Sequence, residues 1–231
     1  DVKLPDSANF PAERWFWFDP PFHRNQSVLL HRQPDGVWRI DFQLGWDADP
    51  EVEKRPERIQ PRVDEMMRRT GAELLVVFGG DGTVHEVVNG IAGREGVELA
   101  VVPRGTGRDF VRTHGIPKRL ADALRIAKEG EARPFDLGRA TYRVGDHDET
   151  AWFANAGSVG MSGAVAARAN DTTKALGAKT SYLIALGAVF ARWKNVELNV
   201  KVDGEARSGL MEDVIVGIGR YQAGGMMTTP D

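Results

Sequence analysis

The chain has 231 residues, of which 42% are hydrophobic and 27% charged, with no cysteine and a net charge of -3. These values exclude a disordered segment, a disulfide-stabilised scaffold and a thiolate metal site, and they allow one large domain or two small ones. The near-neutral charge also excludes a strongly basic nucleic-acid binder, so no nucleic-acid partner is expected.

The composition changes near residue 65. Only Gly36 and Gly45 of the 26 glycines precede residue 66, whereas eight of the 12 prolines and four of the six tryptophans do. A single domain seldom changes composition so sharply, and we therefore expect a domain boundary at this point.

Neither a signal peptide nor a membrane span is predicted. The N-terminus lacks a basic start followed by an apolar stretch. The longest apolar stretch, residues 182–191, is about half the length that crosses a bilayer. We expect a cytoplasmic protein, and peripheral contact with a membrane surface stays open.

The N-terminal block predicts β structure. Residues 27–32 are a short apolar strand, and residues 37–44 alternate apolar and polar side chains. Between them, residues 33–36 hold the Pro and Gly of a turn, so the two strands are expected to form a hairpin. Residues 59–69 are predicted to be a helix.

The middle of the chain alternates strands and helices. Residues 73–78 and 99–102 are continuous apolar runs, which are typical of parallel strands buried on both faces. Helices are predicted over residues 83–89 and 120–128. This order indicates an open, parallel α/β sheet.

After about residue 134 the pattern indicates a mostly antiparallel second domain. Asp203 and Gly204 mark a hairpin turn. Two helices, near residues 163–170 and 181–193, interrupt the strands. The predicted strands are residues 135–142, 151–155, 196–202 and 213–218.

A glycine loop, residues 79–82, follows the first buried strand and opens a helix. Free backbone N–H groups and the helix dipole favour an anion there, and glycine lets a phosphate approach the backbone. Asp81 would repel phosphate unless a cation lay between them, which suggests Mg²⁺ and a nucleotide. The alternative is an ordinary turn in which Asp81 caps the helix.

A second loop, residues 103–110, follows the next parallel strand. The carboxyl ends of parallel strands share one edge, where ligands of such sheets bind. Asp109 in this loop and Asp136 further on would then join Asp81 around a water-mediated Mg²⁺ site. Asp136 taken alone is also consistent with a solvated acid at a strand end.

Five motifs carry a family resemblance. They occur in order over about residues 66–231, as GGDGTVHEVVNG (79–90), PRGTGRDFVR (103–112), FDLG (135–138), FANAGSVGMSGAVA (153–166) and GRYQAGGMMTTPD (219–231). This region resembles the catalytic region of the diacylglycerol kinase and sphingosine kinase family of lipid kinases.

The resemblance implies an ATP-binding α/β domain followed by a β-rich domain, with transfer of the γ-phosphate of ATP to a lipid hydroxyl. It implies that Asp81, Asp109 and Asp136 organise Mg²⁺, and it makes Asp81 a candidate catalytic base. The implied nucleotide contacts are Gly79, Gly80, Gly82, Thr83, Gly105 and Thr106.

Residues 11–63 resemble something else, an internal segment of flavin-dependent aromatic-ring hydroxylases that act on 3-hydroxyphenylpropionate-type substrates. The chain has neither the dinucleotide fingerprint of that family nor its later flavin motif. Without a phosphate loop for the cofactor, we expect neither FAD binding nor hydroxylation from this segment.

This chain differs from the resembled kinases at several points. The resembled kinases begin with a strand carrying an Asn-Pro motif and continue beyond the GGMM motif, and those elements are missing here. Arg108 also stands where they usually have Asn. The sequence therefore predicts a chimeric, truncated chain with three parts: a hydroxylase-like β fragment and connector (1–65), an incomplete kinase-like ATP-binding α/β domain (66–133) and a truncated β-rich domain (134–231).

Three functions remain in view. The first is an ATP-dependent, diacylglycerol kinase-like phosphotransferase whose activity is reduced or lost through truncation. The second is an FAD-dependent hydroxylase fragment. The third is a non-catalytic fusion product that at most binds nucleotide.

Overall fold

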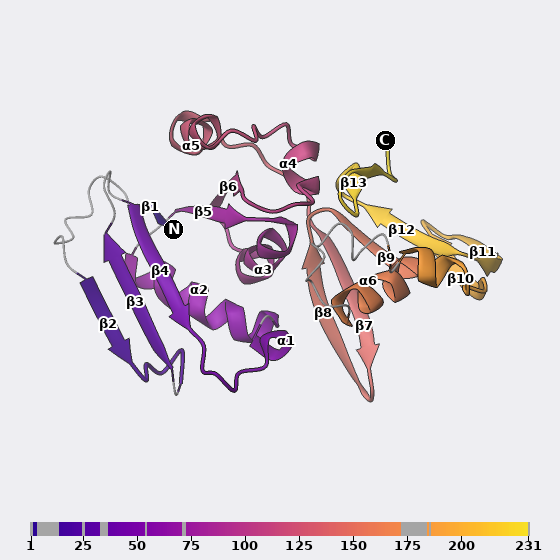
Figure 1. Cartoon of the computed structure of the whole chain (residues 1–231), viewed down its shortest axis with the longest axis horizontal. Coiled ribbons are helices and arrows are strands. Elements are labelled where there is room, and N and C mark those ends of the chain that lie inside the picture. Colours follow the sequence, from indigo (N-terminus) through magenta and orange to yellow (C-terminus); the bar gives the residue numbers. More distant parts are fainter. Residues whose placement is uncertain are drawn as a thin grey trace.

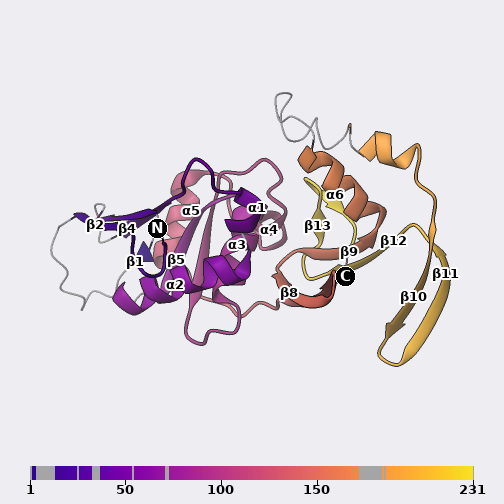
Figure 2. The same cartoon turned by 90° about the horizontal axis from the view of Figure 1, so that it is seen from below.

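The computed structural model describes residues 2–3, 14–24, 26–32, 37–53, 55–70, 73–171, 184 and 186–230. Its fold is mixed α/β, in two parts that lie side by side (Figures 1 and 2). The first part is built on a six-stranded sheet, and the described residues of the second form two-stranded antiparallel ribbons and helical segments.

The six-stranded sheet has the order β2-β3-β4-β1-β5-β6. Among the described residues of this sheet, β5 and β6 form the one parallel pair, and the two-residue strand β1 pairs antiparallel with both β4 and β5. The sheet is therefore mixed rather than wholly parallel, and the N-terminal hairpin is part of it. Its strands are β1 (Val2–Lys3), β2 (Arg14–Phe18), β3 (Ser27–Arg32), β4 (Val37–Gln43), β5 (Leu74–Gly79) and β6 (Glu98–Pro103).

Helices cover both faces of the β5–β6 pair. Alternate residues of a strand point to opposite faces. Helix α3 (Asp81–Ile91) therefore packs on one face and α5 (Leu120–Glu129) on the other. The α3 side holds Val77, Val84, Val88 and Val101, and the α5 side holds Val76, Val102 and Ala123. The two strands predicted to be buried are confirmed.

Helix α2 (Pro56–Thr70) follows the short helix α1 (Pro50–Glu53) and lies against α3. The two helices approach closely at Gly90, where a Cβ atom would lie 2.9 Å from Val63 Cγ2. Helix α2 begins three residues before the predicted start at residue 59. Residue 65, where a boundary was expected, lies inside this helix.

The predicted N-terminal hairpin is confirmed as β3 and β4, which pair antiparallel. Val28 and Leu30 on β3 are fully buried. The predicted turn at residues 33–36 lies outside the described residues. Strand β2, which the sequence did not predict, pairs with β3 and extends the hairpin.

Every strand pair described in the second part is antiparallel, as predicted. At the turn between β10 and β11, Asp203 and Gly204 have φ of 49° and 89°, as a two-residue hairpin turn requires. The pairs are β7 (Gly138–Val144) with β8 (His147–Phe153), β9 (Ala156–Gly160) with β12 (Asp213–Gly217), β10 (Val196–Val202) with β11 (Glu205–Met211), and β13 (Tyr221–Gln222) with β14 (Met226–Met227); helix α6 spans Met161–Asp171.

Some elements differ from their predicted bounds. Strand β7 begins at Gly138 rather than at residue 135, because Phe135 and Leu137 pack on the core of the first part. The Phe135 ring lies 5.9 Å from that of Phe110. In the helix predicted over residues 181–193, residues 184 and 186–190 are helical, 191–192 form a turn, and 181–183 and 185 lie outside the described residues.

Across the described residues, no helix combines the length and the apolar character needed to cross a membrane.

Candidate functional site

The two glycine loops touch each other. We call residues 79–82 the first glycine loop and residues 103–108 the second. The backbone N–H groups of Arg104 and Gly105 donate to Gly79 O at 2.8 and 3.3 Å. A Cβ atom on Gly105 would lie 2.4 Å from Gly80 Cα, so a side chain at that position would force the loops apart. The loops therefore lie together at the carboxyl ends of β5 and β6, as their parallel order predicts.

All six predicted nucleotide contacts lie in these loops or at the start of α3. The surroundings of Gly82 are open, since no atom outside its chain neighbours and its own helix backbone lies within 4 Å of the point a Cβ would occupy. Thr83 packs against Gly79, while Thr106 is exposed. The first turn of α3 thus presents unpaired N–H groups and the positive end of the helix dipole to an accessible surface.

Asp81 is the first residue of α3 and joins three segments of the chain. Its Oδ1 accepts hydrogen bonds from Phe110 N at 2.8 Å and from Asn155 Nδ2 at 3.5 Å. Gly80 is the N-cap of α3, so the alternative of Asp81 as a capping residue is wrong. No described residue donates to Asp81 Oδ2, which leaves that oxygen available to a ligand.

Asp109 opens helix α4 (Asp109–Thr113) and is buried. Its Oδ1 accepts from Arg112 Nη1 at 2.9 Å, and its Oδ2 accepts from Gly224 N at 2.8 Å. Burial raises the pKa of Asp109, and the neighbouring negative charge of Asp81 also raises it. The hydrogen bond from the Gly224 amide and the charge of Arg112 lower the pKa, but the net shift is upward. In this structure Asp109 therefore connects the second glycine loop to the C-terminal segment.

The carboxylates of Asp81 and Asp109 face a common gap. A Cβ atom on Gly107 would lie 2.6 Å from Asp81 Oδ2 and 3.7 Å from Asp109 Oδ2, so the glycine leaves this space open. Asp136 is exposed and makes no hydrogen bond or ion pair with a described residue. Among the described residues, no three acidic or histidine side chains lie close enough to share a metal ion. Both oxygens of Asp109 accept hydrogen bonds, so Asp81 Oδ2 is the one carboxylate oxygen of this pair to which no described residue donates.

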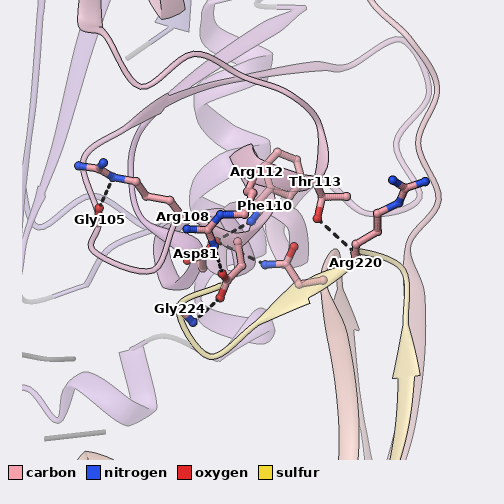
Figure 3. Close-up of polar contacts among 10 residues, drawn as sticks. Asp81, Gly105, Arg108, Phe110, Arg112, Thr113, Arg220 and Gly224 are labelled. Atoms are coloured by element: carbon pink, nitrogen blue, oxygen red, sulfur yellow. Dashed lines mark hydrogen bonds and ion pairs between the residues drawn. The ribbon is translucent and has the colours of Figure 1, made fainter. Parts of the chain in front are cut away.

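The C-terminal segment, from the second part of the molecule, lies against α4 (Figure 3). Arg220 N donates to Thr113 Oγ1 at 3.2 Å, and Gly224 N donates to Asp109. Gly224 and Gly225 have φ of 83° and 112°, which only glycine adopts without strain. A Cβ on Gly225 would lie 2.6 Å from Arg112 Nη1, so this glycine also makes room for the arginine.

Asn89 contacts the second part, and the sequence reasoning missed it. It lies on α3 and is 3% exposed. Its Nδ2 donates to Trp152 O at 2.9 Å and its Oδ1 accepts from Trp152 N at 2.8 Å. A polar residue in the apolar run of this helix was a signal of a buried hydrogen-bonded contact, although its partner could not be read from the sequence.

A separate cavity lies beside β6, α5 and residues 130–135, with mainly apolar side chains in its wall. No residue of either glycine loop lines it. The candidate site is therefore defined by the loop contacts and the two carboxylates rather than by this cavity.

Comparison with known families gives a match to this region. Residues 43–140 match the family described as the diacylglycerol kinase catalytic domain. The matched segment contains both glycine loops, Asp81, Asp109 and Asp136. The chain thus carries a segment similar to the diacylglycerol kinase catalytic domain.

Similar solved structures agree with this match. A protein from Bacillus anthracis str. Sterne, provisionally assigned as a diacylglycerol kinase, is 27% identical over 77% of this chain, with a TM-score of 0.53. A diacylglycerol kinase structure from the same organism is 26% identical over 77% of the chain, with a TM-score of 0.50. The chain spans 56% and 53% of the lengths of these two proteins. No curated protein matches the chain.

The kinase match also bears on the N-terminal block. It begins at residue 43, so it includes residues 43–63 of the segment that resembles flavin-dependent hydroxylases. The comparisons do not support that hydroxylase resemblance.

Proposed function

We propose that this chain is an ATP-dependent lipid kinase that transfers the γ-phosphate to a diacylglycerol-type hydroxyl. The observation that carries the proposal is the backbone contact between Gly80 and Gly105, which joins two phosphate-type loops beside Asp81. The match of residues 43–140 to a diacylglycerol kinase catalytic domain supports the same reaction class.

In this proposal the loops and the start of α3 bind the nucleotide phosphates through backbone N–H groups. The open backbone at Gly82 admits a phosphate, and Thr83 and Thr106 supply hydroxyl groups. The full set of nucleotide contacts is Gly79, Gly80, Gly82, Thr83, Gly105 and Thr106.

Two carboxylates would organise the Mg²⁺ that accompanies ATP. Asp81 and Asp109 face the gap beside Gly107, and Asp136 is the third, water-mediated member of the proposed set. Bound Mg²⁺ supplies charge neutralisation between the phosphates and these acids. In this proposal Asp81 Oδ2, to which no described residue donates, accepts the proton of the lipid hydroxyl.

The lipid assignment rests on the names of the matched family and structures. A lipid kinase must meet its substrate at a bilayer, so peripheral membrane contact belongs to the proposal.

The test is transfer of radiolabelled γ-phosphate from ATP to diacylglycerol in mixed micelles, with sphingosine as a second acceptor. Wild type should label one lipid, and Asp81→Ala should label it about 100-fold more slowly, because an acid at the phosphate site is lost. Asp146→Ala is the matched control, since Asp146 is fully exposed at the β7–β8 turn.

If wild type and Asp81→Ala transfer equally little phosphate, the kinase proposal fails. A chain that binds ATP without transferring phosphate would instead fit the non-catalytic fusion product.

A further inference from the structure

Strand β8 and the residues that follow it run along α3 and meet it at two points. Near the carboxyl end of α3, Asn89 makes paired hydrogen bonds with the backbone of Trp152. At the amino end, Asp81 Oδ1 accepts from Asn155 Nδ2 at 3.5 Å. The strand therefore runs antiparallel to the helix, and a polar contact lies at each end.

The spacing of the two contacts matches. From Asp81 to Asn89, a helix rises about 12 Å at 1.5 Å per residue. Strand β8 ends at Phe153 and the chain bends over residues 154 and 155, so Asn155 lies at most about 10 Å beyond Trp152, the length of three extended residues. Fixing Trp152 at Asn89 thus brings Asn155 to Asp81. A slip of one residue along the strand would move Asn155 by about 3.3 Å and break its contact, which is already long.

Asn155 also connects strand β8 to the C-terminal segment, so the register of β8 on α3 affects the position of that segment. Its backbone O accepts hydrogen bonds from Ile218 N and Gly219 N, both at 2.7 Å. A side chain at Gly219 would be crowded, because a Cβ there would lie 3.0 Å from Thr113 Oγ1 and 3.1 Å from Asn155 Oδ1. The same segment then reaches Asp109 through Gly224 (Figure 3).

The buried amide of Asn89 is well suited to fix this register. It uses both Nδ2 and Oδ1 on one partner residue, and Nδ2 also donates to His85 O at 2.8 Å. Loss of this side chain would leave the N–H and C=O of the half-buried Trp152 without their described partner, which is costly.

We infer that Asn89 is a positioning residue, which sets the register of the second part on α3 and so holds Asn155 against Asp81. The effect on turnover rests on the proposed kinase function; the effect on the register does not. The contact between the glycine loops involves no residue of the second part, so nucleotide affinity should depend little on Asn89.

The test compares Asn89→Ala, Asn155→Ala and the double variant with wild type. The control is Asn199→Ala, an exposed asparagine on β10. Hydrogen exchange followed by mass spectrometry reports the Trp152, Ile218 and Gly219 amides, and steady-state kinetics separates kcat from the KM for ATP. Asn89→Ser, which keeps one hydroxyl for Trp152, serves if the alanine variant does not fold.

We expect Asn89→Ala to exchange about 10-fold faster at Trp152, Ile218 and Gly219, because opening there becomes easier. We expect kcat to fall about 10-fold with the KM for ATP nearly unchanged, as when an interaction specific to the transition state is lost. Asn155→Ala should reproduce the kinetic effect, and the double variant should be no slower than either single variant, because both act through one contact.

Unchanged exchange at Ile218 and Gly219 in a folded Asn89 variant would overturn the inference. So would a rise in the KM for ATP equal to the fall in kcat, or additive effects in the double variant. If wild type transfers no phosphate, the proposed function fails by itself, and the exchange data still decide whether Asn89 sets the register.

Discussion

Arg108 has φ of 61° and ψ of 33°, a left-handed backbone conformation at the amino end of α4. Among residues with side chains, Asn adopts this conformation most readily. That preference accounts for the Asn that the resembled lipid kinases usually carry at this position. Arg108 offsets part of its strain by donating from Nε to Gly105 O at 3.0 Å, a bond that ties it to the second glycine loop.

Replacing Arg108 with Asn should stabilise the fold. We expect Arg108→Asn to raise the free energy of unfolding by about 0.5–1 kcal/mol, because left-handed strain is relieved. Arg108→Ala should lower it, since the strain stays and the bond to Gly105 is lost. Urea denaturation followed by tryptophan fluorescence measures both. An alanine variant more stable than the asparagine variant would contradict this explanation.

Asp109 predicts a pH dependence of stability. Burial raises its pKa in the folded state, so the fold binds this proton more tightly than the unfolded chain does. Its contribution to stability is therefore fully present below the ordinary Asp pKa, and it is lost as pH rises through the raised value. Relative to Asp109→Asn, wild type should become less stable over that window.

The measurement is a series of urea denaturations of wild type and Asp109→Asn between acidic and neutral pH. The difference between the two unfolding free energies isolates the Asp109 carboxyl from the other acids. If wild type gained stability over Asp109→Asn as pH rose, the direction of the pKa shift would be wrong.

In the elements at the start of α3 and in the two glycine loops, some glycines are needed for packing and others are expected to matter for nucleotide binding. Gly82 has open space around it, whereas Gly105 is against the backbone of Gly80. We expect Gly82→Ala to keep or slightly raise the melting temperature, since Ala is favoured over Gly in a helix by about 1 kcal/mol. We expect it to weaken nucleotide binding about 10-fold, because its methyl group stands where a phosphate approaches.

Gly105→Ala is the matched variant, and it should lose both properties. Its Cβ would overlap Gly80 Cα, and overpacking of this kind costs about 1–3 kcal/mol. Thermal melts and titration with a slowly hydrolysed ATP analogue measure the pair. Wild-type affinity in Gly82→Ala would show that phosphate does not bind at this helix end.

The same elements show why the sequence predicted the loops well. Each loop consists of glycines that directly follow a buried strand, which is a local pattern in the sequence. The parallel order of the two strands is enough to bring both loops to the same edge of the sheet. The approach of Gly80 to Gly105 explains why glycine is needed in both. Arg112, by contrast, makes contacts that no local pattern contains, because Tyr221 and Gly225 come from the far end of the chain.

Across the whole molecule, the features that the sequence could not predict depend on distant pairings. The two residues of β1 join the N-terminal hairpin to β5 and make the sheet mixed, although so short a strand has no periodicity to detect. Asn89 is hydrogen-bonded to Trp152, and Asp109 to Gly224, although the two residues of each pair lie far apart in the sequence. The division of the chain at residues 133 and 134 remains a prediction.

We propose that one site, made by both glycine loops and Asp81, binds ATP through a cation. Calorimetric titration with a slowly hydrolysed ATP analogue, with Mg²⁺ or with EDTA, tests this claim most directly. For wild type, Mg²⁺ should strengthen binding at least about 10-fold, because without it Asp81 repels the phosphates. For Asp81→Ala, affinity should differ little between Mg²⁺ and EDTA. Wild type that binds no nucleotide, or that binds equally well without Mg²⁺, would contradict the claim.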